Sequence, residues 1–176
     1  MKDFVIVADS GLMNKDNIAE LETKNYKYVL GAKIKSESKE TKSWIFSLQK
    51  QDGSFYEYQK TEQARLIVGY SDNRSKKDRY NREKGIKRLE KEYTTETLTK
   101  DKVNKRCYNK FLEISDDVKV NINYNKIKED ERWDGLKGYI TNTNLPAKMV
   151  YEEYSGFRDI KKVVRHLPVT EPLMRT

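Results

Sequence analysis

The stretch FVIVADSGL, from Phe4 to Leu12, places an unbroken apolar run directly before a single acid, Asp9. An apolar run bounded by a Ser-Gly turn signal is typical of a strand that is covered on both faces of a sheet. Asp9 then lies at the carboxyl end of this strand, the edge of an open α/β sheet where ligands and catalytic groups collect. The alternative is that Asp9 caps the next helix or closes a turn.

The composition predicts a folded chain with a modest core and an anionic partner. Hydrophobic and charged residues each make up 36% of the 176 residues, a length that suits one domain or one domain with an insertion. The formal net charge of +8 favours a polyanion, because Lys and Arg that neutralise phosphates release counterions. Nucleic acid is therefore the expected partner.

Other classes of partner are not expected from the sequence. No segment approaches the roughly 20 apolar residues that span a bilayer, and the opening apolar run lacks the basic region of a signal peptide. Cys107 is the only cysteine and His166 the only histidine, so neither an internal disulfide nor a zinc cluster is expected. We expect a cytoplasmic, nucleoid-associated protein with no membrane contact and no small-molecule substrate.

The first third of the chain predicts strands and helices in alternation. A strand that ends at Ala8 is followed by a short amphipathic helix over 14–23 and by a β-rich segment over 26–34. A right-handed crossover would make the two strands parallel neighbours. A second helix is expected over 38–48, with Trp44, Ile45 and Leu48 on one face.

The remaining chain mixes hairpins with two longer helices. A turn at Asp52-Gly53 leads into one strand, and residues 64–71 supply its partner. A long basic helix is expected over 72–93. The predictions after residue 95 are a mixed region, a strand over 118–124, a turn at Asp134-Gly135, a strand over 136–141 and a helix that starts near Pro146.

Five separated blocks together resemble the DDE transposases of bacterial insertion sequences, in their ribonuclease H-like catalytic domain. The similarity covers about 150 residues. The blocks are VADSGL (7–12), NIAELETKNYKYVLGAKIK (17–35), RLIVGYSDNRSKKDRYNREKGIKRLEK (65–91), WDGLKGYITNTNLP (133–146) and YSG (154–156).

The resemblance implies DNA transposition, in which three carboxylates hold two Mg²⁺ ions for DNA cleavage and strand transfer. Two metals about 4 Å apart clamp the attacking and leaving oxygens, and they need several anionic ligands. Asp9 matches the second of the family's catalytic acids, so it is the predicted catalytic residue and metal ligand.

Two departures from the family pattern argue against catalysis by this chain. The first acid belongs to an earlier strand, whereas only eight residues precede Asp9 here. The third acid is a Glu seven residues after the match to Tyr154, and Lys161 stands there. A lysine would repel the metal that a glutamate binds. The final residues, 166–176, are unlike the family and are expected to form an irregular tail.

The basic helix is the strongest predicted binding feature besides Asp9. Its charges are mixed, and the alternative is a solvated face of salt bridges. The resemblance favours contact with the DNA backbone, for which the predicted residues are Arg74, Lys76, Lys77, Arg79 and Arg82. Trp133 and Asp134 are expected to form a core anchor and a turn rather than a metal site.

These observations predict an α/β fold with an α+β insertion: a partial ribonuclease H-like core that carries a mixed β and helical insertion. The expected parts are 1–35 (strand, helix and strand of the core), 36–132 (insertion with the basic helix), 133–165 (return strand and final helix) and the tail. We expect a transposase, truncated at its N-terminus, that is inactive alone. DNA is its predicted partner, together with a second copy or an intact transposase.

Two alternatives remain open at this point. One is a non-catalytic DNA-binding remnant, which should be indifferent to Mg²⁺ and to loss of the Asp9 charge. The other is a chain that does little, because half a sheet leaves an unpaired edge and an uncovered apolar face.

Overall fold

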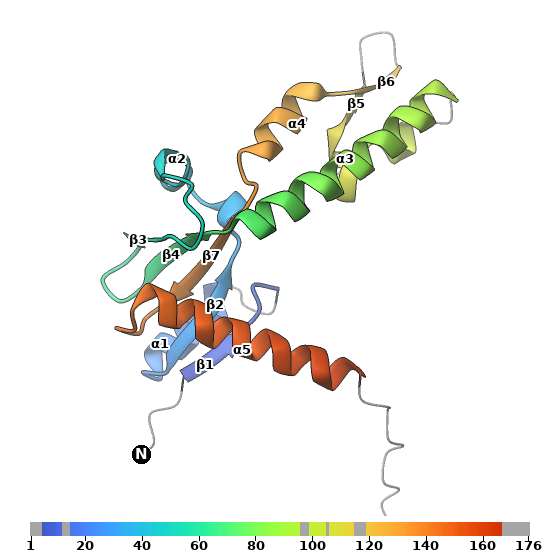
Figure 1. Ribbon diagram of the computed structural model, residues 1–176. Coiled ribbons are helices and arrows are strands. Elements are labelled where there is room, and N and C mark those ends of the chain that lie inside the picture. The colour runs from blue at the N-terminus through green and yellow to red at the C-terminus, as the bar shows by residue number, and fades with distance from the viewer. Residues whose placement is uncertain (1–4, 12–14, 96–98, 105, 115–118, 167–176) are drawn as a thin grey trace, which may run out of the picture. The chain divides into compact units, whose positions relative to one another are not determined.

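The computed structural model describes residues 5–11, 15–95, 99–104, 106–114 and 119–166, and these form a mixed α/β protein (Figure 1). The chain divides into two compact units, each built from more than one stretch of sequence. The first unit combines 1–37, 55–69 and 137–176, and the second combines 38–54 and 70–136.

The first unit contains a five-stranded mixed sheet and two helices. Its elements are β1 (Val5–Ala8), α1 (Lys15–Thr23), β2 (Lys27–Ala32), β3 (Phe55–Gln59), β4 (Arg65–Tyr70), β7 (Leu136–Thr141) and α5 (Ala147–His166), with a short 3₁₀ turn, Ile34–Ser36, after β2. The last residue of β4, Tyr70, and the first residue of β7, Leu136, already belong to the second unit.

The strands follow the order β1-β2-β7-β4-β3 across this sheet. β1 and β2 are parallel, with Val5 opposite Lys27 and Ala8 opposite Leu30, as the predicted crossover requires. β7 lies antiparallel to β2, and β3 pairs with β4 as the predicted hairpin. Gly53, in the turn before β3, has φ +74°, a backbone conformation that glycine adopts without strain.

The core of the first unit lies between the sheet and α5, which packs against β1, β2 and β3 (Figure 1). Its fully buried members are Val29, Ile67, Tyr139, Val150 and Tyr154. Val5 and Val7 pack on this cluster, yet every residue of β1 is only half-buried. The expectation of a strand covered on both faces is therefore wrong, because β1 occupies an edge of the sheet.

The second unit is built around one long helix, α3, and contains a small hairpin. Its elements are α2 (Lys39–Ser47), α3 (Asp72–Thr94), the 3₁₀ helices η2 (Lys100–Lys102) and η3 (Cys107–Phe111), β5 (Leu112–Ile114), β6 (Val120–Ile122) and α4 (Tyr124–Glu131). Leu89 of α3, Phe111, Leu112, Val120 and Ile127 form its buried cluster.

The strand predicted over 118–124 is shorter in the structure and gives way to a helix. Residue 118 lies outside the described residues, β6 ends at Ile122, and α4 begins at Tyr124. The Asn123 side chain accepts a hydrogen bond from the backbone N–H of Lys126 (2.9 Å) and so caps this helix. An apolar residue every second position favoured a strand, but the Asn cap ends that pattern.

The boundaries of the predicted insertion, 36–132, also differ from the two units. The β3–β4 hairpin falls inside that range, yet it completes the five-stranded sheet of the first unit. Pairing between β4 and β7 connects residues that are far apart in the chain, so local sequence pattern does not reveal it. The predicted irregular tail, apart from residue 166 at the end of α5, lies outside the described residues.

Candidate nucleic-acid interface

Asp9 follows β1 directly, and its side chain contacts the hydroxyl group of Tyr154 in α5. The Tyr154 hydroxyl donates a hydrogen bond to Asp9 Oδ1 at 2.7 Å, and Tyr154 itself is only 1% exposed. Gly31 in β2 leaves room for this contact, since a Cβ there would lie 2.8 Å from the tyrosine hydroxyl oxygen. Asp9 thus lies at the predicted end of the strand, where it anchors a core tyrosine.

The described side chains do not fit the magnesium pair that the resemblance implies. Among the residues that the structure describes, no group of three or more His, Cys, Asp and Glu side chains could hold a metal ion. A two-metal site needs several anionic oxygens. The Lys161 side chain, at the position of the family's third acid, lies outside the described residues.

One face of α3 is buried and fixes the orientation of the whole helix. Arg82, Gly85 and Leu89 lie on this face, with spacings of three and four residues. α3 packs there against η3 and β6. Gly85 allows the close approach, because a Cβ at this position would overlap the ring of Tyr108.

Arg82 does not fit its predicted role as a DNA contact. Only 5% of its side chain is exposed, and its two terminal nitrogens donate to the Asp134 carboxylate at 2.5 and 2.7 Å. Hydrogen bonding to Asp134 raises the pKa of Arg82 above its ordinary value. Asp134 is thus a buried ion-pair partner as well as part of the predicted turn, in which Gly135 has φ +78°.

The face of α3 opposite Arg82 and Leu89 is basic and solvent-exposed. At about 100° of rotation per residue, six exposed side chains share roughly 100° of the helix circumference. This lysine face consists of Lys76, Lys77, Tyr80, Lys84, Lys87 and Lys91.

No acid interrupts the lysine face. The acids of α3 lie outside its arc, at Asp72, Asp78, Glu83, Glu90 and Glu92. Within the described part of the chain, none of the five lysines forms an ion pair or a hydrogen bond through its side chain. Tyr80, in the middle of the face, is 64% exposed. The face therefore presents a dense positive charge that no side chain in the described ranges neutralises.

The four predicted basic residues other than Arg82 divide among three environments. Lys76 and Lys77 belong to the lysine face. Arg74 Nε lies 3.6 Å from Asp78 Oδ2 and donates a hydrogen bond to the Leu136 carbonyl at 3.2 Å. Asp78 therefore partly neutralises the charge of Arg74. Arg79 lines a separate cavity.

The sequence prediction missed Tyr80, Lys84, Lys87 and Lys91. That prediction selected basic residues that are close together in the sequence, in the first half of the helix, and did not ask which of them share one face. The available signal was the 3.6-residue period, because the apolar positions Ile86 and Leu89 already marked the buried face.

Comparisons with known proteins leave the resemblance as an expectation. No family model, no curated protein and no solved structure matches this chain. Among the described helices, none is long and apolar enough to cross a membrane.

Proposed function

We propose that this chain is a DNA-binding protein that contacts the phosphate backbone through the lysine face of α3. The observation that carries the proposal is the exposed, acid-free arrangement of Lys76, Lys77, Lys84, Lys87 and Lys91 around Tyr80. Lysines on such a face can release counterions from a phosphate backbone, which supplies affinity independent of sequence.

The dimensions of α3 are compatible with this role. An α-helix with its side chains is about 10–12 Å across, and the major groove of B-DNA is about 12 Å wide. Lys91 lies fifteen residues after Lys76, which corresponds to about 22 Å along the helix axis, long enough to pass several phosphates. Lysine contacts of this type position DNA without reading its sequence.

The ribonuclease H-like relationship belongs to the same proposal. It is supported by the parallel β1–α1–β2 unit with Asp9 at the end of β1, and by α5, which packs on those two strands. DNA cleavage is not part of the function we propose for the chain acting alone, because the described residues include no group of three or more His, Cys, Asp and Glu side chains that could hold a metal ion. A transposase-related protein of this kind would occupy DNA without cutting it.

The test compares two triple variants of the full chain on the same short duplex. One variant replaces Lys84, Lys87 and Lys91 by Gln, and the control variant replaces Lys33, Lys39 and Lys128, which are exposed lysines outside α3. Both remove the same charge. Fluorescence anisotropy across a salt series gives the affinity and its salt dependence.

We expect the α3 variant to bring the negative slope of log K against log[salt] closer to zero, by about 0.9 for each lysine that contacts a phosphate. The control should keep a slope close to that of the unmodified chain. If both variants lost the same amount of affinity and salt dependence, the net charge and not the lysine face would cause binding, and the proposal would be refuted.

A further inference from the structure

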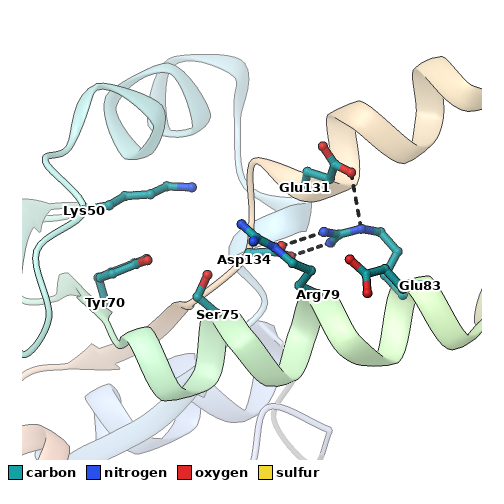
Figure 2. Close-up of a pocket in the computed structure, with 8 residues that line it drawn as sticks. Lys50, Tyr70, Ser75, Arg79, Glu83, Glu131 and Asp134 are labelled. Atoms are coloured by element: carbon teal, nitrogen blue, oxygen red, sulfur yellow. Dashed lines mark hydrogen bonds and ion pairs between the residues drawn. The ribbon is translucent and has the colours of Figure 1, made fainter.

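A polar cavity of about 400 Å³ lies within the second unit, beside the first turns of α3 (Figure 2). It is distinct from the lysine face, because Ser75, Arg79 and Arg82 belong to other sides of the helix. Its lining is polar and charged throughout: Lys50, Tyr70, Ser75, Arg79, Arg82, Glu83, Glu131 and Asp134.

Three hydrogen-bond donors of this cavity have no partner within the described part of the chain. The side chains of Tyr70, Ser75 and Arg79 make no hydrogen bond or ion pair there. Figure 2 shows all three directed toward the space between them. The Tyr70 ring is held in place against Gly135, where even a Cβ would not fit.

Lys50, from the segment that follows α2, adds a fourth donor on the side of the cavity where Tyr70 lies (Figure 2). Its Nζ donates to the Arg132 carbonyl at 2.7 Å, which orients the ammonium and leaves two further N–H groups. Burial lowers the pKa of Lys50 from its ordinary value, while the Asp134 carboxylate opposes that shift. A partly desolvated ammonium gains more from a nearby anion than one in open water.

The acids of the cavity are concentrated around Arg82. Asp134 forms its two hydrogen bonds with this guanidinium, and Glu131 lies 3.7 Å from its Nε. In Figure 2, Glu83 also lies away from Lys50 and Tyr70. The positive charges of Lys50 and Arg79 therefore face the same part of the cavity as the two unpartnered hydroxyls.

We propose that Lys50, Tyr70, Ser75 and Arg79 bind one phosphate group. A phosphate offers several strong acceptor oxygens and a charge near −2, and it would satisfy two hydroxyls, a guanidinium and an ammonium together. Most of the lining surface is polar, which suits an anion better than an aliphatic ligand. The phosphate comes either from inorganic phosphate or from the end of a nucleic acid strand.

Inorganic phosphate is the first probe, added to the full chain at constant ionic strength with chloride as the reference. Both tryptophans, Trp44 and Trp133, belong to the second unit, so their fluorescence reports binding there. The variants are Lys50→Gln and Arg79→Gln, and the matched control is Lys128→Gln, which removes one exposed charge from α4 of the same unit.

We expect saturable binding of one phosphate per chain, weakened about tenfold or more by Lys50→Gln and by Arg79→Gln, with little change in Lys128→Gln. Retained circular dichroism would show that the variants are folded. No saturable response, or equal weakening in all three variants, would overturn the proposal.

A second arm identifies the source of the phosphate. Short DNA strands with a 5′-phosphate and with a 5′-hydroxyl are compared on the unmodified chain and on Arg79→Gln. A preference for the 5′-phosphate that disappears in Arg79→Gln assigns the site to strand ends, whereas equal affinities together with phosphate binding assign it to the free ion. This outcome is independent of the lysine face, whose own variants remove general DNA affinity instead.

Discussion

Arg82 and Asp134 form a buried ion pair, and the stability of the second unit depends on both residues being present. Each charge loses its hydration in the second unit, and the two short hydrogen bonds replace that hydration. Such a pair stabilises little compared with apolar residues of the same volume, but removing one partner leaves the other charge buried and unpaired. The pair therefore makes the second unit sensitive to single substitutions at these positions.

Arg82→Met should lower the free energy of unfolding of the second unit by about 3–5 kcal/mol. The double variant Arg82→Met with Asp134→Leu should recover much of this loss, because no isolated charge remains. Urea unfolding followed by tryptophan fluorescence measures both. Arg88→Met is the control, since Arg88 is 80% exposed in its pair with Glu92, and its loss should cost under about 1 kcal/mol. An equal cost for Arg82→Met and Arg88→Met would contradict this account.

At the scale of the elements, the local sequence pattern correctly predicted those helices and strands whose formation is determined by neighbouring residues in the chain. The predicted strand–helix–strand order of β1, α1 and β2 is confirmed, and so are the β3–β4 hairpin and α3. Two-residue alternation, turn glycines and apolar periodicity carry this information within short windows. The α4 helix was missed because its only buried residue, Ile127, gives too weak a period.

Gly85 shows how α3 depends on a neighbour that the sequence pattern does not reveal. In an exposed helix interior, replacing glycine by alanine stabilises by up to about 1 kcal/mol. At Gly85 the new methyl group would overlap the first ring carbons of Tyr108, which lie too close to the backbone of η3 to move freely. Tertiary packing here outweighs helix propensity.

Gly85→Ala should therefore destabilise the second unit, by about 1–3 kcal/mol. Urea midpoints from tryptophan fluorescence measure the effect. Asn81→Ala, on an exposed part of α3, provides the control and should be close to neutral. Adding Tyr108→Ala should make the Gly85→Ala step itself less costly in a double-mutant comparison. Stabilisation by Gly85→Ala alone would show that η3 moves away easily.

At the scale of the whole molecule, the sequence predicted individual helices and strands better than it predicted which of them pack together in one compact unit. The predicted single insertion crosses both units, because β3 and β4 join a sheet whose other strands come from the two ends of the chain. The candidate site was also only partly predictable. Asp9 lies at the end of β1 as expected, but its contact with Tyr154, 145 residues away in the chain, follows from the packing of α5.

The same contact bears on whether the chain can cut DNA. Cleavage by two metals requires several carboxylates around one phosphodiester. Asp9 accepts a hydrogen bond from the Tyr154 hydroxyl, and the described residues include no group of three or more His, Cys, Asp and Glu side chains that could hold a metal ion. A supercoiled plasmid incubated with the full chain and millimolar Mg²⁺ should therefore remain unnicked above background. Asp9→Asn should bind duplex DNA with unchanged affinity and unchanged salt dependence, because Asp9 is not part of the lysine face. Mg²⁺-dependent nicks that disappear in Asp9→Asn would mean instead that further acids reach Asp9 when DNA is bound.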